Sequence, residues 1–71
     1  MRLEKIVSDA LANTEDDGYL LSIVVAKRAN QLAEGAQPLI KADKNKEKLT
    51  DIALKEVAQG VIVIDKIIPN E

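Results

Sequence analysis

The segment that most restricts the fold is the longest apolar stretch, Tyr19–Ala26, with the sequence YLLSIVVA. Its length and setting favour a helix, predicted over about residues 16–34. The apolar side chains of that helix do not share one face, because three of them lie off its main core stripe: Leu20, Ile23 and Val24. A helix that is apolar on every side must be covered on every side. Either the first helix folds back over it, or another chain does.

The rest of the chain offers little with which to cover that helix. Of its 71 residues, 46% are hydrophobic, but there is a single Tyr and no Phe, Trp or Cys. A domain of this size buries only about 60% of the surface that its unfolded chain exposes. Neither aromatic bulk, disulfides nor cysteine-bound metal can compensate. The sequence therefore predicts one small domain, residues 1–71, with an aliphatic core that a partner completes.

Two further helices are predicted, one on each side of the apolar segment. Apolar residues recur at helical spacing over residues 3–12 and again over residues 50–59. Thr14 or one of the acids after it is a candidate N-cap for the middle helix, and Thr50 for the last. A glycine follows each of the two later helices, where a left-handed cap residue is common. The expected fold is mostly α, a small bundle of about three helices.

The periodicity also predicts which side chains are buried. In the second half of the middle helix, the predicted core face carries Val25, Ala26, Ala29, Leu32 and Ala33. The opposite, solvent face carries Lys27, Arg28, Asn30, Gln31 and Glu34. In the last helix the predicted core stripe is Ala53, Leu54, Val57, Ala58 and Val61. Ile52 falls on the polar side of that helix with Lys55 and Glu56, and is therefore expected to be an exposed apolar residue.

The segments outside the helices are predicted from composition. Residues 41–48, KADKNKEK, are expected to form a solvated loop. Residues 61–68, VIVIDKII, are β-branched and bounded by Gly60 and Pro69, so they prefer an extended form. A lone strand has no ladder partner in this chain, which leaves three outcomes for the segment: it stays frayed, continues as a helix or pairs with something external. Residues 61–71 are predicted to be an extended or frayed tail.

The sequence gives little support to catalysis or to a metal or cofactor site. It has no His and no Cys, and neither Ser8 nor Ser22 lies in a Gly-x-Ser-x-Gly turn, so a nucleophilic triad has no base. The acidic residues 15–17 do not have the spacing of an EF-hand loop, and helix capping is the favoured interpretation. No catalytic residue, metal ligand or cofactor is expected.

Nucleic acid and membranes are also poor candidates for a partner. The net charge is −2, and there is no aromatic platform for base stacking beside Lys27 and Arg28. No apolar run is long enough to span a bilayer. Residues 1–5 lack a signal-peptide pattern, and the acids Glu4 and Asp9 argue against a transit peptide. We expect a soluble, cytoplasmic chain whose partners are proteins.

Two stretches carry a recognisable pattern, AKRANQLAEGAQPL at residues 26–39 and IALKEVAQG at residues 52–60. The first fits Ala-basic-Arg-Ala-x-Gln-Leu followed by Gly and Pro-Leu, and the second fits Ala-Leu-x-Glu with a closing Gly. In these stretches the sequence resembles the omega subunit of bacterial DNA-directed RNA polymerase, and the related small subunit shared by archaeal and eukaryotic polymerases. The resemblance covers about residues 19–60 and leaves residues 61–71 as a C-terminal tail.

The resemblance implies a non-catalytic subunit that binds the largest polymerase subunit, β′, and promotes its folding and assembly into core enzyme. Arg28 and Gln31 would then be fixed donors that anchor either the turn after the helix or the β′ chain, and Pro38 and Leu39 would shape a clasp. The predicted partner-binding residues are Leu20, Ile23, Val24, Lys27, Arg28, Gln31, Gly35, Pro38, Leu39 and Ile52.

Two alternatives concern other ligands and partners. In some relatives an N-terminal arginine helps to bind guanosine tetraphosphate at the β′ boundary, which makes Arg2 the candidate here. The start Met1-Arg2-Leu3 lacks the small residue that usually follows the initiator Met, and the spacing to the first helix is altered, so the sequence argues against that site. The alternative function is a free-standing helical protein whose homodimer buries Leu20, Ile23, Val24 and Ile52 against themselves.

Overall fold

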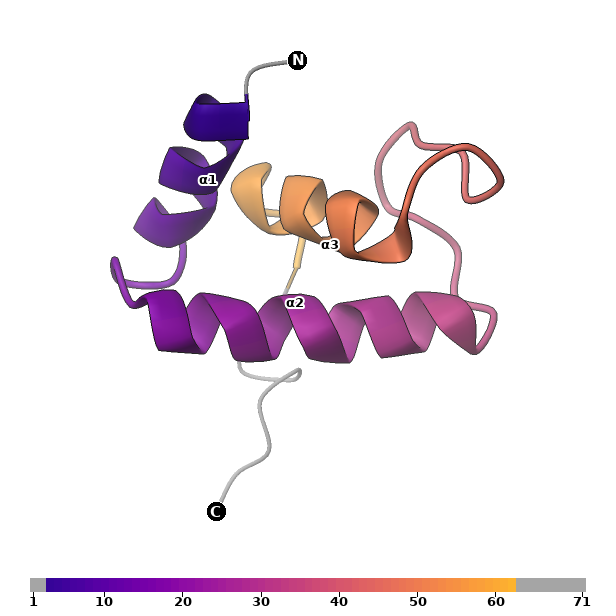
Figure 1. The fold of residues 1–71 in the computed structure, drawn as a ribbon, viewed down its shortest axis with the longest axis horizontal. Coiled ribbons are helices and arrows are strands. Elements are labelled where there is room, and N and C mark those ends of the chain that lie inside the picture. Colours follow the sequence, from indigo (N-terminus) through magenta and orange to yellow (C-terminus); the bar gives the residue numbers. More distant parts are fainter. Residues whose placement is uncertain (1–2, 63–71) are drawn as a thin grey trace.

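The computed structural model describes residues 3–62, and these form three helices joined by two connections. The helices are α1 (Leu3–Ala12), α2 (Gly18–Ala33) and α3 (Leu49–Ala58) (Figure 1). No strand occurs within residues 3–62. The predicted fold of about three helices is thereby confirmed, with helix boundaries within two residues of those expected. Of the predicted tail, residues 63–71 lie outside the described part of the chain.

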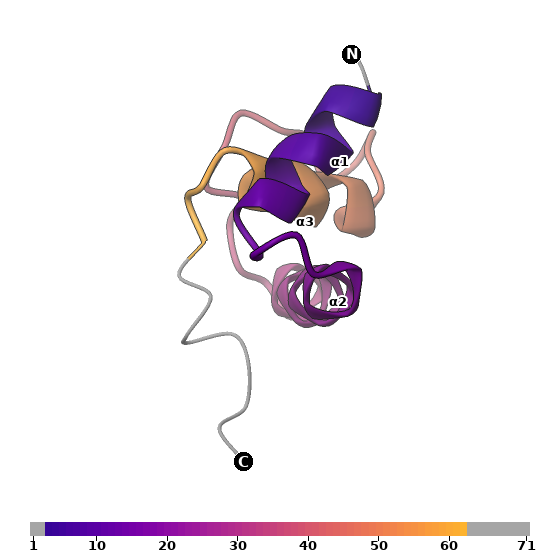
Figure 2. The same cartoon turned by 90° about the vertical axis from the view of Figure 1, so that its left-hand side faces the viewer.

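The long helix α2 forms one side of the molecule, and α1 and α3 both pack on the same face of α2 (Figures 1 and 2). α1 sits over the N-terminal end of α2, and α3 lies beside α1 and extends toward the C-terminal end of α2. α3 therefore provides most of the cover over the apolar segment, and α1 contributes a smaller part through Ala10.

The apolar clusters of the core consist of aliphatic side chains, as the composition predicted. One cluster joins all three helices through four buried residues, Ala10, Leu21, Val24 and Val57. Half-buried side chains surround it, including Leu11, Leu20 and Leu54. A second cluster, Leu32, Ile52 and Ala53, joins the C-terminal half of α2 to the start of α3. Burying such side chains contributes roughly 1.5–3 kcal/mol each, which is the main favourable term available to a chain without large aromatic residues.

The buried face of α2 is the predicted one only in part: Leu32 is buried, and Val25 and Ala29 are half-buried against the core clusters. Its buried residues are Leu21, Val24, Arg28 and Leu32. Ala26 and Ala33, predicted to face the core, are exposed, and Arg28, predicted to face solvent, is buried. Because α1 and α3 lie on the same side of α2, the burial follows a single row of residues three or four apart, and that row includes Arg28.

The predicted exposure of Ile52 is wrong, as is the placement of Glu56 on the solvent side of α3. Both residues are fully buried, with 0% of their surface exposed. The stripe predicted for α3 is correct for Ala53 and Val57, but Val61 is exposed. α3 packs against two helices at once, so its buried surface is wider than one face, and a pattern that assigns every charged residue to solvent cannot show this.

Capping explains where the helices begin and end. The Asp17 carboxylate accepts hydrogen bonds from the backbone N–H groups of Tyr19 (3.0 Å) and Leu20 (3.2 Å), which fixes the start of α2. Thr14 instead donates its hydroxyl to the carbonyl of Ala10 at 3.0 Å, at the end of α1. The prediction of Thr50 as an N-cap is wrong, because α3 begins one residue earlier and its N-cap, Lys48, makes no side-chain cap bond.

Gly35 ends α2 as predicted, in a left-handed conformation with φ 114°. The N–H of Ala36 donates to the carbonyl of Gln31 (3.0 Å), and the N–H of Gly35 donates to that of Leu32 (3.2 Å). These two bonds are the Schellman arrangement, which closes a helix and turns the chain away from its axis. The chain is thereby directed from the end of α2 back toward α3 (Figure 1).

Candidate functional site

The motif residues of α2 and α3 meet at a buried ion pair between Arg28 and Glu56. Arg28 Nε donates to Glu56 Oε1 at 2.7 Å, and Arg28 Nη2 donates to Glu56 Oε2 at 3.0 Å. Arg28 is 7% exposed and Glu56 is 0% exposed. The planar guanidinium fork matches the two carboxylate oxygens, which makes this the strongest kind of side-chain hydrogen bonding in proteins.

The same two side chains hold the segment that leaves α2, residues 35–39, here called the strap. Arg28 Nη2 donates to the carbonyl of Gln37 at 3.1 Å, and the N–H of Leu39 donates to Glu56 Oε2 at 2.7 Å. Arg28 Nη1 donates to Gln31 Oε1 at 3.1 Å. Of the two predicted roles for Arg28, the structure shows that it anchors the turn. Gln31, predicted to be a donor, accepts at its Oε1.

The electrostatics of the pair favour its charged form. The hydrogen bond with the Glu56 carboxylate raises the pKa of Arg28, against the opposing effect of burial and with the help of the negative charge on Glu56. No buried side-chain nitrogen or oxygen within residues 3–62 lacks a hydrogen-bond partner. A buried pair of this kind adds little net stability compared with an apolar pair, but it fixes a geometry and is costly to break.

The loop that follows the strap is attached to the body at two points. Lys44 Nζ donates to the carbonyl of Ala36 at 2.7 Å. Lys55 of α3 forms an ion pair with Glu47. The hydrogen bond from Lys55, together with one from the backbone N–H of Asp43, lowers the pKa of Glu47. The loop, predicted to be solvated, therefore also contacts the strap through the bond from Lys44 to Ala36.

The clamped strap presents apolar side chains to solvent. Leu39 is 59% exposed although its N–H is held by Glu56, and Pro38 beside it is half-buried. Gly35 and Gln31 are exposed next to them. Together Gln31, Gly35, Pro38 and Leu39 form what we call the strap surface. A fixed backbone with a protruding apolar side chain is suited to docking against a protein, since ordering it on binding costs little entropy.

The other predicted partner-binding residues occupy different places. Val24 and Ile52 are fully buried in the two core clusters, and Arg28 is buried in the ion pair. Leu20, Ile23 and Lys27 are half-buried along α2. Arg2 lies outside the described residues. Whether any of these residues touches a partner stays a prediction, but Val24, Arg28 and Ile52 have their contacts within this chain.

Glu56 is the central residue of the site that was not predicted as a candidate. Periodicity placed it on the solvent side of α3, and its partner Arg28 is 28 residues away in sequence. The one available signal was its place in the Ala-Leu-x-Glu half of the motif. A carboxylate that belongs to the same pattern as an arginine is a candidate partner for that arginine.

The described residues provide no basis for a metal site or for a membrane-spanning helix. Within residues 3–62 no group of acidic side chains is arranged to hold a metal ion, and Asp17 of the acidic cluster serves as the cap of α2. In the same part of the chain no helix has the length and apolar character needed to cross a membrane.

Comparison with known proteins agrees with the motif. The family model described as RNA polymerase Rpb6 matches residues 9–64. The chain is 55% identical over 65 residues to DNA-directed RNA polymerase subunit omega of Campylobacter lari, covering 92% of this chain and 90% of the relative. It is 58% identical over 65 residues to that of Nitratiruptor sp., covering 92% and 93%. It is 53% identical to that of Campylobacter curvus over 71 residues, the full length of both. No solved structure gave a significant match.

The family model matches most of the chain, and the relatives align along nearly their whole length. The chain therefore belongs to the RNA polymerase Rpb6 family, as an omega-type, non-catalytic subunit of DNA-directed RNA polymerase. The predicted resemblance to the omega subunit is confirmed.

Proposed function

We propose that this subunit binds the largest polymerase subunit, β′, through the strap surface and promotes its folding and assembly into core enzyme during transcription in the cytoplasm. The observation that carries the proposal is the clamp itself. The buried Arg28–Glu56 pair fixes the strap at Gln37 and at Leu39, while the Leu39 side chain remains 59% exposed. A backbone segment that is already fixed can present its apolar side chain to a partner with little loss of conformational entropy, which fits a docking role.

A protein partner fits the charges of the site better than nucleic acid does. The one arginine of the motif is neutralised by Glu56 inside the molecule, so it cannot serve as a phosphate contact. The chain as a whole carries a net charge of −2, which opposes binding to a polyanion.

Assembly would be assisted by mass action. A preformed surface that binds only the folded form of a β′ segment stabilises that form by RT ln(1 + [L]/Kd), about 2.7 kcal/mol when the subunit is at 100 times its Kd. No catalysis by the small subunit is needed. Its contribution is a fixed shape on which the larger chain completes its fold.

The homodimer alternative is less well supported by the fold. Two of the four side chains that it would bury, Val24 and Ile52, are already fully buried within the chain. The remaining two, Leu20 and Ile23, are half-buried, and Leu20 packs against the core cluster beneath α1. These four side chains therefore leave little apolar surface for the dimer that was predicted from them.

The test is co-expression of the chain with its host's β′, followed by a pull-down and gel filtration. Leu39→Asp is expected to reduce the recovery of β′ roughly tenfold or more, because it places a charge at the centre of the contact. Ser22→Asp, which adds the same charge at an exposed position in the first half of α2, is the matched control and should leave recovery unchanged. Equal recovery with Leu39→Asp and the native chain would refute docking through the strap, and a stable dimer that excludes β′ would favour the alternative.

A further inference from the structure

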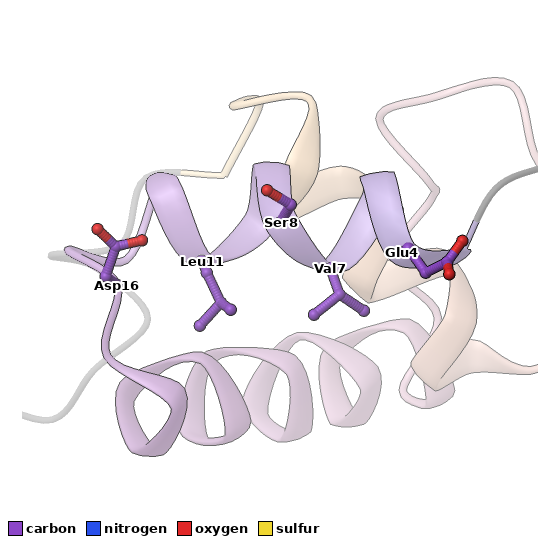
Figure 3. A pocket seen from close by; sticks show the side chains of 5 residues that line it. All are labelled: Glu4, Val7, Ser8, Leu11 and Asp16. Carbon is purple, nitrogen blue, oxygen red and sulfur yellow. The ribbon is translucent and has the colours of Figure 1, made fainter.

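A groove of about 470 Å³ lies along α1, at the opposite end of the molecule from the strap (Figure 1). Its lining residues are Glu4, Val7, Ser8, Leu11 and Asp16 (Figure 3). Val7 and Leu11 lie one helical turn apart and point toward α2, so they form an apolar floor. The Glu4 and Asp16 carboxylates stand at the two ends of the row.

The rim of the groove is acidic, and no ion pair within the described residues 3–62 neutralises it. Neither Glu4 nor Asp16 forms an ion pair with another residue in the range 3–62. Residues 3–18 contain five acidic side chains, Glu4, Asp9, Glu15, Asp16 and Asp17, against one basic side chain, Lys5. That lysine is itself bonded to Asp9 at 3.2 Å. The groove therefore lies in a negative field.

We propose that this groove binds a short segment of a partner protein that carries apolar side chains between two basic ones. The apolar groups would cover Val7 and Leu11, and a lysine or arginine at each end would meet Glu4 and Asp16. Glu4 and Leu11 are seven residues apart on one helix, a rise of about 10 Å, and Asp16 lies beyond Leu11 (Figure 3). The two basic residues therefore belong at least two helical turns apart if the segment is helical.

The negative charge around the groove favours a protein partner over nucleic acid or a membrane surface. Phosphate groups of nucleic acid and the anionic surface of a membrane would both be repelled by Glu4, Asp16 and their acidic neighbours. An apolar floor with a carboxylate at each end is complementary to a basic, amphipathic segment in both respects.

The groove and the strap surface are independent. One adjoins α1, and the other follows the C-terminal end of α2 (Figure 1). A helix of 16 residues is about 24 Å long, so two segments bound at these places need not collide. The inference does not depend on binding of β′ at the strap, and either could fail without the other.

The test uses amide spectra of the full chain and two synthetic peptides. Both carry a central Leu-x-x-x-Leu pair, flanked by lysines in one and by glutamates in the other. The lysine peptide is expected to shift the signals of α1 and of residues 15–17, with an affinity that falls as salt is raised. The glutamate peptide should leave those signals in place. Binding of neither peptide, or of both equally, would overturn the proposal.

Variants of the groove separate its charge from its apolar floor. Asp16 has φ 56°, a conformation that asparagine adopts readily, so Asp16→Asn removes the charge with little strain. Asp16→Asn and Glu4→Gln are each expected to weaken the lysine peptide roughly two- to fivefold. Val7→Asp, at a position outside the two core clusters, should abolish its binding. Glu34→Gln, an exposed carboxylate at the far end of α2, is the matched control and should bind normally.

Two other occupants are distinguished by the same spectra without peptide. Groove signals that change with the concentration of the chain would mean that a second copy fills it. Groove signals that change in the full chain carrying Ile67→Asp would mean that the chain's own C-terminal residues fill it. Either result would overturn the proposal of a separate basic segment.

Discussion

The two ends of α2 are held to the rest of the molecule by different means. At the N-terminal end, Leu21 and Val24 pack against Ala10 of α1 and Val57 of α3, and Asn13 donates to the carbonyl of Val57 at 2.8 Å. At the C-terminal end, the main attachment beyond apolar packing is the buried Arg28–Glu56 pair and the strap bonds that it makes. Apolar packing is non-directional and supplies most of the stability. A fork of charged hydrogen bonds is directional and sets where a segment lies.

The two ends of α2 therefore have different roles in the fold. The aliphatic end makes a domain of this size stable enough to exist, and the ionic end gives one exposed segment a defined position. The first kind of contact tolerates changes of shape at moderate cost, whereas the second does not tolerate loss of one partner. Variants at the two ends should therefore differ in kind as well as in size.

The largest effect is expected from breaking the ion pair. Glu56→Ala leaves the buried Arg28 charge without its partner, and the free energy of unfolding should fall by about 3–5 kcal/mol. A single core of this size rarely supplies more than about that amount, so most of the variant should be unfolded at room temperature. Urea unfolding followed by circular dichroism measures the change. A loss below about 1 kcal/mol would show that the pair is not closed in solution.

A smaller loss is expected at the aliphatic end. Leu21→Ala removes a largely buried side chain, and the free energy of unfolding should fall by about 2–3 kcal/mol. Amide spectra of the folded fraction are the more telling measurement. Signals of residues 35–39 should stay at their native positions, because the clamp does not involve Leu21. Movement of the strap signals in this variant would mean that the two ends are coupled.

The smallest effect concerns the loop beyond the strap and depends on pH. The folded state lowers the pKa of Glu47, so the Lys55–Glu47 pair stabilises the chain above the ordinary glutamate range and loses this contribution as the pH falls through it. The Glu47→Gln variant should be slightly less stable than the native chain at about pH 7, and this difference should shrink as the pH falls below the ordinary glutamate range and through the lowered pKa of Glu47. Unfolding curves at about pH 7 and at a pH below that range measure the difference. A difference that persists unchanged at the lower pH would assign the effect to something other than this charge.

The helices could be predicted from the sequence because their causes are local. Apolar spacing, the Asp17 cap and the φ of Gly35 all act within a few residues. The site was only partly predictable, since its two halves are far apart in the chain. Periodicity assigns the charged side of a helix to solvent, so it predicted Glu56, and Ile52 on the same side, to be exposed. The packing of α3 against two helices buries both residues. The resemblance supplied Arg28, Pro38 and Leu39 but not what Arg28 binds.

The central claim is that the ion pair positions the strap for docking, and one double variant tests it directly. Arg28→Met together with Glu56→Leu replaces the pair by apolar side chains, an exchange that often leaves stability unchanged or improved. It also removes the bonds to Gln37 and Leu39. The native and double-variant chains would be co-expressed with β′, and their ratio in the recovered complex measured by mass spectrometry. We expect the folded double variant to be at a disadvantage of about tenfold, since its strap must be ordered on binding. Equal recovery of the two chains would contradict the claim.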